Sequence, residues 1–274
     1  MAFIKMPDLP NGYLSFSQVD AYLNCPKKYE WRYIVKPPMV GGSPALLMGS
    51  QGHEAIAEML EHVRDGKRVM PKIIIEKHSK KLRKKLNQLA RELDVQIPVT
   101  EHVRQHDMLL EQWVKDILPE FRPTAVEVKV ETTIGGYPFL MYIDAIHDNK
   151  RVLDWKFTGA AKNKYVLANS LQLSVYSIGT GLNEVGFGSL VKPKAGREAS
   201  WTPKVVVNYT TRTQAERNWA TQVVKSTAES IRSGHFPLCG PENFLCSDKY
   251  CDFFPICRGK ERQATPSWLS GFDV

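Results

Sequence analysis

The sequence predicts an α/β fold in which helices flank a mixed β-sheet. Between residues 125 and 157, apolar residues recur at alternate positions in three successive stretches, which is typical of half-buried strands. A stretch of helical period follows, and then two more strand-like stretches. One domain with a helical insertion explains this order better than two domains, so we expect residues 1–274 to form a single unit.

The N-terminal part of the chain is predicted to be helical. Ser17 and Asp20 have capping-box spacing, which predicts a helix that begins at Ser17 and ends before Pro26. Because proline suits the first turn of a helix, a second short helix is expected directly after it. Cys25 would then lie at the corner between the two helices.

Two longer helices are expected next, over residues 48–64 and 72–93. The second is strongly basic. Such charge runs are usually solvated helix faces, but this one could also follow a phosphate backbone through Lys80, Lys81 and Lys84.

The remaining elements are expected to form the sheet and its covering helices. Gly135 and Gly136 turn the chain between the first two strands of a three-stranded meander. The final helix opens at Thr213, with Glu216 in capping-box spacing, and ends near Gly234. The other elements are strands over 125–131, 138–146, 151–157, 184–191 and 204–209, and a helix over 163–179.

Composition limits the function classes. The 274 residues carry a formal charge of +8, which favours an anionic partner, of which nucleic acid is the commonest polymer. No long apolar run predicts a transmembrane helix or a secretory signal, so we expect a cytoplasmic protein with no membrane partner. Five cysteines in such a chain indicate reduced or metal-bound thiols rather than disulfides.

Acidic and basic side chains occur in the second and third strands of the meander. Asp154 and Lys156 are two residues apart in a strand and therefore project to the same side. A hairpin between the strands can bring Asp144 beside them. Two carboxylates and an ammonium group on one face suit a hard divalent cation that activates water for attack on a phosphate.

Three further residues fit this site. His53 follows Gly52 on a predicted helix, and neutral imidazole is a competent metal ligand. Gln172 and Tyr176 are four residues apart on one helix face and could hydrogen-bond phosphate oxygens. Each of the three alone would more often be an ordinary core or surface residue.

These residues together resemble a known family. Gly49-x3-His53, Ile143-Asp144, Asp154-x-Lys156 and Gln172-x3-Tyr176 occur in the order and spacing of the RecB-type branch of the PD-(D/E)XK nucleases. The resemblance extends from Ser15 to Arg258 and implies a restriction-endonuclease-like core. Two positions depart from the family pattern, Met141 where glycine is frequent and Ile143 where the motif's proline would stand.

The resemblance also implies the roles of the site residues. His53, Asp144, Asp154 and the backbone carbonyl of Trp155 would bind Mg²⁺ or Mn²⁺. Lys156 would be the catalytic cation. Gln172 and Tyr176 would flank the substrate strand.

A second group of chemically active residues is the cysteine triplet Cys246-x4-Cys251-x5-Cys257. A soft-metal centre needs a fourth ligand, and the spacing leaves Cys239 and Cys25 as alternatives and zinc as the default metal. The resemblance implies a 4Fe-4S cluster held by Cys25, Cys246, Cys251 and Cys257, as in phage exonucleases and the CRISPR adaptation nuclease. Cys239 is then left over, and the cluster would be a structural staple between the two ends of the chain.

This pattern divides the expected domain into functional parts. The parts are cluster-binding helices at about 15–35, a helical insertion at about 65–122, the catalytic sheet at about 123–210 and a cluster-binding segment at about 236–260.

The function we expect is that of a metal-dependent deoxyribonuclease. It would act as an exonuclease on linear, preferably single-stranded DNA in recombination, repair or phage DNA processing, in a bacterial cell or a phage-infected host. A recombination or replication protein is a further expected partner. Two alternatives are a non-cleaving DNA-end-binding module, acting in recombination or CRISPR spacer acquisition, and a zinc-stabilised transcription factor.

Aromatic residues around the cysteines could stack on unpaired bases, which would favour single-stranded DNA, or could pack as core beneath the cluster. They are Tyr22, Tyr29, Trp31, Tyr250, Phe253 and Phe254.

Overall fold

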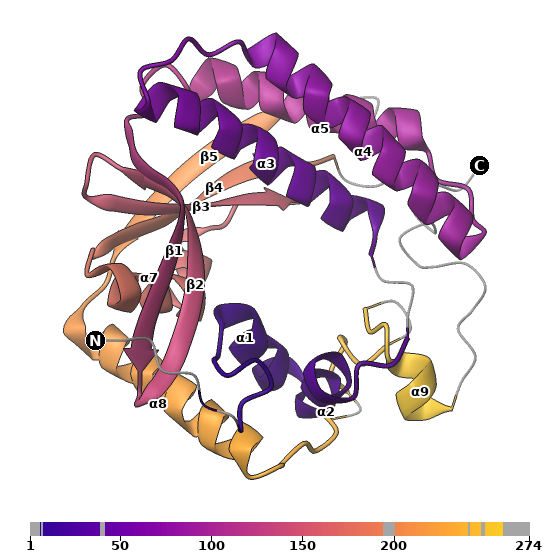
Figure 1. The fold of residues 1–274 in the computed structure, drawn as a ribbon, viewed down its shortest axis with the longest axis vertical. Helices are drawn as coiled ribbons and strands as arrows, with labels where there is room; N and C mark the ends of the chain where they lie inside the picture. Colours follow the sequence, from indigo (N-terminus) through magenta and orange to yellow (C-terminus); the bar gives the residue numbers. More distant parts are fainter. Residues whose placement is uncertain are drawn as a thin grey trace.

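The computed structural model describes residues 6, 8–38, 42–193, 201–240, 242–247 and 250–259. Within these residues, five strands form one mixed sheet in the order β1-β2-β3-β4-β5 (Figure 1). Only β3 and β4 are parallel; the other neighbours are antiparallel. This confirms the predicted mixed sheet flanked by helices. The strands are β1 (Pro123–Ile134), β2 (Tyr137–His147), β3 (Arg151–Thr158), β4 (Glu184–Val191) and β5 (Lys204–Thr211).

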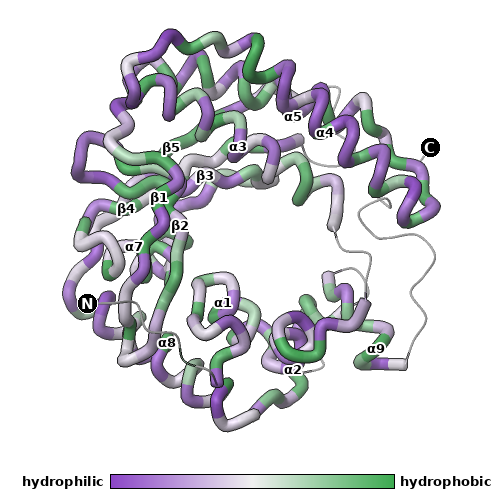
Figure 2. The backbone as a smooth tube through the Cα atoms, in the orientation of Figure 1, coloured by the Kyte–Doolittle hydropathy of each residue, from purple (hydrophilic) through white to green (hydrophobic). Residues whose placement is uncertain are grey.

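Three long helices cover one face of the sheet and lie together at the top of Figure 1. They are α3 (Pro44–Arg64), α4 (Pro71–Leu93) and α5 (Val99–Asp116). Their apolar residues share a core with Leu153 and Trp155 of β3, where the Trp155 ring meets that of Trp113 on α5. Figure 2 shows that the outer side of α4 is mostly hydrophilic, as a basic helix on the surface requires.

The other face of the sheet packs against helices from both ends of the chain. Residues of α1 (Phe16–Asn24), α7 (Leu171–Thr180) and α8 (Gln214–Arg232) form a second core with Ile143 and Val152. The shorter helical elements are α2 (Pro26–Tyr29), the π-helical turn η1 (Glu30–Val35), α6 (Lys164–Ala168) and α9 (Phe254–Arg258). No helix in the described ranges has the length and apolar character needed to span a bilayer.

The predicted helix over 163–179 is wrong in one respect, because it is two helices, α6 and α7. Arg212, which is fully buried, donates through Nη2 to the carbonyl oxygens of Leu167 and Ser170 at the break. The Ser170 side chain then accepts a hydrogen bond from Leu173 N and caps α7. A buried guanidinium from β5 thus takes the place of hydrogen bonds within a continuous helix.

The predicted start of the first helix is also displaced. The N-cap is Ser15, whose hydroxyl accepts from Gln18 N, and not Ser17. The corner at Cys25 is confirmed, since Cys25 ends α1 and its side chain caps α2. The capping box of Thr213 and Glu216 is present at the start of α8.

The segment that follows α8 meets α1 and α2 at this corner, and α9 lies near α2 in the lower part of Figure 1. Tyr22 Oη donates to the carbonyl oxygen of His235 at 2.6 Å, and Lys27 N donates to that of Pro237 at 3.2 Å. The segment after α8 is therefore bound to α1 and α2 by backbone hydrogen bonds.

Candidate active site and cysteine cavity

The site begins where β2 and β3 separate. The two strands pair over three residue pairs that end at Ala145 and Leu153. Beyond this point Trp155 N donates to Oδ2 of Asp144 at 2.7 Å, so a carboxylate takes the place of a backbone partner. Asp144 and Asp154 lie at this fork, from the two strands that the sequence predicted.

Asp154 and Lys156 interact on one side of β3, as their spacing predicted. Lys156 Nζ lies 2.7 Å from Oδ2 of Asp154. Asp154 is only 3% exposed, and its buried Oδ2 is paired with the Lys156 ammonium. Burial and the neighbouring charge of Asp144 raise the pKa of Asp154 to about 6, although Lys156 opposes the shift. A buried carboxylate oxygen beside a second carboxylate attracts positive charge.

The other oxygen of Asp154 is held by α7. Gln172 Nε2 and Tyr176 Oη donate to Oδ1 of Asp154 at 2.7 Å and 3.1 Å, and Gln172 also donates to Tyr176 Oη at 2.8 Å. Both side chains are buried. The resemblance implies that they flank the substrate; in the structure they orient a carboxylate.

His53 reaches the site because α3 approaches β3 closely. A Cβ at Gly52 would overlap the ring of Phe157, so only glycine allows this approach. His53 Nδ1 then lies 3.2 Å from Oδ2 of Asp144. Burial lowers the pKa of His53, but the hydrogen bond and the charge of Asp144 raise it more, and the net shift is upward.

The donor set suits a hard divalent cation. The carboxylates of Asp144 and Asp154 influence each other electrostatically, His53 lies 3.2 Å from Asp144, and the residue between Asp154 and Lys156, Trp155, adds a backbone carbonyl. Across the residues described, no three His, Cys, Asp or Glu side chains form a group that could hold a metal ion. Lys156 contacts Oδ2 of Asp154, and both His53 Nδ1 and Trp155 N contact Oδ2 of Asp144.

Cavities lie on both sides of the carboxylate pair. One, of 620 Å³, is lined by His53, Asp144 and three glutamates of α3. The other, of 400 Å³, is lined by Gln172 and Tyr176 and is rich in aromatic and hydroxyl groups. The aromatic members of the second cavity besides Tyr176 are Tyr13, Phe16, Tyr33 and Tyr142.

Glu127 of β1 is a candidate site residue that the sequence did not predict. Its neighbours pair with the neighbours of Asp144, and it has a left-handed backbone, with φ of 47°. It lines the cavity of His53 and Asp144, and burial together with the Asp144 charge raises its pKa. In the sequence it looks like any outward-facing residue of an alternating strand, as Glu131 does, so no pattern could have found it.

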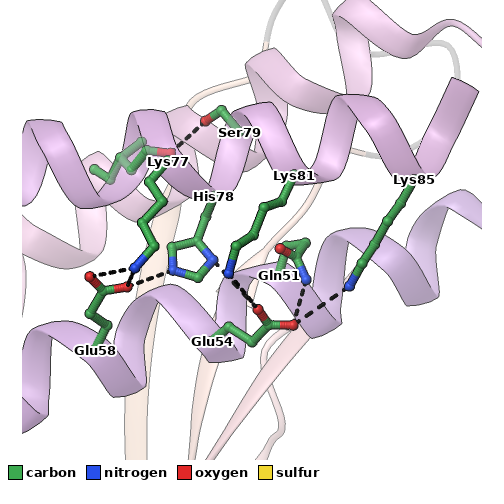
Figure 3. A network of polar contacts seen from close by, with 9 residues as sticks. Gln51, Glu54, Glu58, Lys77, His78, Ser79, Lys81 and Lys85 are labelled. Atoms are coloured by element: carbon green, nitrogen blue, oxygen red, sulfur yellow. Dashed lines mark hydrogen bonds and ion pairs between the residues drawn. The ribbon is translucent and has the colours of Figure 1, made fainter.

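The basic helix α4 faces an acidic row on α3 (Figure 3). Lys77 lies 2.8 Å from Glu58, and Lys81 and Lys85 lie 3.4 Å and 3.6 Å from Glu54. The acidic residues therefore neutralise a large part of the run that suggested DNA binding.

The three lysines predicted to bind nucleic acid differ in their surroundings. Lys80 is paired with Glu76 at 2.7 Å, and Lys81 with Glu54. Lys84 is exposed and has no ion pair with any residue that the structure describes. Of these three lysines, Lys81 alone lines the cavity of His53 and Asp144.

All five cysteines line a single cavity of 530 Å³ between α1, α2 and the C-terminal segment. The cavity also contains the basic side chains of Lys28, Arg32 and Arg258. Burial, together with hydrogen bonds to Cys25 and Cys246, raises the pKa of the Cys239 thiol to about 12. Cys239, to which the resemblance gives no role, thus lies in the same cavity as the four cysteines that are predicted to bind the cluster.

The four predicted ligands share a feature that Cys239 lacks. Each receives a hydrogen bond from nitrogen: Cys25 from Lys28 N, Cys257 from Trp31 Nε1, Cys246 from Arg258 Nη2 and Cys251 from the backbone of Phe253. No nitrogen donor in the described ranges reaches Cys239. Hydrogen bonds of this kind stabilise sulfur that carries negative charge.

Three of the six predicted aromatic residues near the cysteines belong to the core. Tyr22, Tyr29 and Phe253 are buried, and the Trp31 indole is committed to Cys257. Tyr250 is the exposed exception among those described. The rings of Tyr22, Tyr29 and Phe253 therefore pack in the core and are not available to stack on bases.

Comparison with known proteins identifies the family. The sequence profile of the PD-(D/E)XK nuclease superfamily matches residues 13–258. No curated protein sequence matches the chain significantly.

Among solved structures, the chain is similar to the crystal structure of a protein named "Putative exonuclease" from Eubacterium rectale. The TM-score is 0.54 at 14% identity, over 95% of this chain and 94% of that one, which is a likeness of fold. A second structure, that of SSO0001, gives a TM-score of 0.37 at 19% identity over 65% of this chain and 81% of that one, which is too low to support an argument. The profile match, over most of the chain, shows that this protein belongs to the PD-(D/E)XK nuclease superfamily.

Proposed function

We propose that the protein is a divalent-metal-dependent deoxyribonuclease that degrades linear DNA from its ends. The observation that supports this most strongly is the convergence of Asp144, Asp154, Lys156 and His53 at the β2–β3 fork. Nucleases of this superfamily typically use Mg²⁺ or Mn²⁺.

The residues of the fork divide the work. His53, Asp144, Asp154 and the Trp155 carbonyl would hold the cation, which when bound supplies an activated water and neutralises charge on the phosphate. Lys156 Nζ lies 2.7 Å from Asp154, where it can stabilise the negative charge of the transition state.

Gln172 and Tyr176 fix Oδ1 of Asp154, so that Oδ2 points consistently toward the reacting group.

Single-stranded DNA is the substrate that we favour. The aromatic cavity beside Gln172 and Tyr176 offers surfaces on which unpaired bases can stack. Lys84 on α4 can contact a phosphate without breaking an ion pair. The similar fold of the protein named as an exonuclease agrees with action at ends. Recombination, repair or phage DNA processing, with a recombination or replication protein as partner, is the proposed setting.

We also propose that Cys25, Cys246, Cys251 and Cys257 hold a 4Fe-4S cluster. The donor chemistry fits, because four thiols with nitrogen donors line a basic cavity suited to a negatively charged centre.

A digestion assay on anaerobically purified protein tests the nuclease. End-labelled linear single-stranded, linear duplex and circular single-stranded DNA are incubated with Mg²⁺ or Mn²⁺, using the wild type, Asp154→Asn and Lys156→Ala. Lys150→Ala, an exposed lysine in the β2–β3 turn, is the matched control. We expect metal-dependent loss of linear single strands, reduced about 100-fold or more in the two site variants but not in the control.

Cleavage of the circle would make the protein an endonuclease. Retention of DNA on a gel without cleavage of any substrate would favour the end-binding module instead.

A further inference from the structure

The cysteine cavity contains one more thiol than a four-thiolate centre uses. Cys239 lines it together with Cys25, Cys246, Cys251 and Cys257. The family resemblance gives Cys239 no role.

Its thiol does not contact all four equally. The neighbouring thiols that it meets are those of Cys25 and Cys246. Cys251 has Cys257 and Cys25 as thiol neighbours, and Cys257 has Cys25 and Cys246; Cys239 is a neighbour of neither. Cys239 is therefore adjacent to two of the predicted ligand positions and not to the remaining two.

The backbone that carries Cys239 is fixed in this place. Before it, the carbonyl oxygens of His235 and Pro237 accept hydrogen bonds from Tyr22 Oη and Lys27 N, at 2.6 Å and 3.2 Å. After it, Asn243 Nδ2 donates to the carbonyl oxygen of Asn24 at 3.1 Å. The proximity of Cys239 to Cys25 thus follows from hydrogen bonds on both sides of the loop and not from the thiol contact alone.

We propose that Cys239 is a reserve ligand of the thiolate metal centre, able to replace Cys25 or Cys246 but not Cys251 or Cys257. This inference rests on the proposed metal centre. When Cys239 binds, its thiol releases its proton to solvent and the sulfur forms a bond to the metal. If the ligand that it replaces is still present, that thiolate leaves the metal and takes up a proton, so charge and atoms balance. Iron in a cluster and zinc both accept thiolate in this way.

The absence of a nitrogen donor to Cys239 explains why it is the reserve and not one of the four. A thiolate at that position would lack the hydrogen bond that each other cysteine receives, so binding through Cys239 is weaker while all four remain. It becomes the preferred ligand only when Cys25 or Cys246 is lost.

Alanine substitutions in the full chain test the proposal. Iron, acid-labile sulfide and zinc per chain are measured after anaerobic purification, with the visible absorbance of a cluster as a second readout. Cys25→Ala, Cys246→Ala and Cys239→Ala should each retain metal at nearly the wild-type content. The double variants Cys25→Ala/Cys239→Ala and Cys246→Ala/Cys239→Ala should lose it. Cys251→Ala and Cys257→Ala, for which no reserve thiol is adjacent, should lose it as single variants.

Folding is controlled by circular dichroism of each variant, and release of metal to a chelator gives a rate for those that retain it. Faster release from Cys246→Ala than from the wild type is expected, because Cys239 lacks a nitrogen donor. The proposal is overturned if Cys25→Ala and Cys246→Ala lose metal as completely as Cys251→Ala, or if Cys239→Ala alone does. A wild-type protein that binds no metal would instead refute the metal centre itself, and the reserve ligand with it.

Discussion

Asp154 is the side chain on which three parts of the molecule converge. Lys156 contacts one carboxylate oxygen, and Gln172 and Tyr176 donate to the other. A carboxylate held on one side by two donors has little freedom to rotate, so its remaining oxygen keeps one direction. Orientation of this kind is usually worth about 10- to 100-fold in metal affinity or activity.

The first prediction concerns that orientation. Tyr176→Phe removes one donor to Asp154 Oδ1 and leaves the ring in place, so we expect about 10-fold weaker activation by Mn²⁺ with little change at saturating metal. A metal titration of the nuclease rate measures this. Tyr165→Phe, at a tyrosine that is 76% exposed, is the matched control. Equal metal dependence of both variants would show that Tyr176 has no positioning role.

A second prediction concerns His78, which is buried between α3 and α4. Burial lowers the pKa of His78, despite its hydrogen bond to Glu58, and its Nδ1 has no hydrogen-bond partner in the described ranges. Besides Glu58, the charged groups that face it are Glu54 on α3 and Lys81 on its own helix.

Because the folded state disfavours protonation of His78, this residue's contribution to stability is complete above its ordinary pKa. It declines as the pH falls from about 6.5 toward the lower folded pKa. The free energy of unfolding should therefore decrease between about pH 7 and pH 5.5, and His78→Gln should show a smaller decrease. Urea unfolding at several pH values gives both slopes; parallel curves for the two proteins would contradict the prediction.

At this scale the sequence predicts what periodicity encodes. Residues two apart in a strand project to the same side, which predicts that Asp154 and Lys156 are neighbours. Their ion pair confirms this prediction. Glu127 and His78 escape prediction for a physical reason. The first has a left-handed backbone, with φ of 47°, and helix packing buries the second. Neither feature has a mark in the local sequence pattern.

At the scale of elements, the approach of α3 to β3 decides whether His53 reaches Asp144. Gly52 contacts the Phe157 ring so closely that a methyl group cannot be added without displacing one of the two elements. A Cβ added at Gly49, one helical turn earlier, would lie 3.9 Å from Cβ of Phe157, which is an ordinary van der Waals contact. The two glycines are thus a natural pair for a controlled comparison.

The third prediction is that Gly52→Ala disrupts the site and Gly49→Ala does not. We expect Gly52→Ala to cost about 1–3 kcal/mol of stability through overpacking. A shift of His53 by about 1 Å should lower the cleavage rate by roughly 100-fold. Thermal unfolding and single-turnover cleavage measure the two effects. Partial rescue by Gly52→Ala/Phe157→Ala would establish the ring as the cause, and full activity of Gly52→Ala would refute it.

The break between α6 and α7 is a feature that the local sequence pattern does not predict and that a tertiary contact creates. The apolar stripe of residues 163–179 runs through without interruption, so the period predicts one helix. The break depends on Arg212, a buried side chain from β5 that donates to carbonyl oxygens at the junction. A long-range donor of this kind leaves no mark on the local sequence.

At the scale of the whole molecule, the two ends of the chain are tied beside the sheet. A metal centre that links Cys25 to Cys246 would close a loop of 221 residues. By analogy with a disulfide, closing such a loop disfavours the unfolded state by about 5 kcal/mol. The tie would reinforce the hydrogen bonds by which Tyr22, Asn24 and Lys27 already join α1 and α2 to the segment after α8.

The fourth prediction is that removal of the cysteine-bound metal loosens both ends before it affects the sheet. Oxidative or chelator-driven loss should lower the melting temperature and expose residues near Cys25 and Cys246 to protease first. Limited proteolysis with mass spectrometry identifies the cut sites, and Cys251→Ala serves as a permanently metal-free reference. First cuts within the strands would contradict this order.

The sequence predicts the meander of the first three strands, while the places of β4 and β5 beside β3 come from the structure. The junction of the two ends was expected only from the family resemblance. No local pattern connects residue 25 with residue 246, since their contact is created by packing of the complete chain.

The acidic row of α3 has a consequence for how this protein would bind a polyanion. Association with single-stranded DNA releases condensed counterions from the phosphates, and each phosphate contact changes the slope of log K against log salt by about 0.7. A lysine already neutralised by Glu54 or Glu58 gains little by exchanging one anion for another. The salt dependence of binding should therefore correspond to far fewer contacts than the number of lysines on α4, and most of the slope should come from unpaired charges such as Lys84.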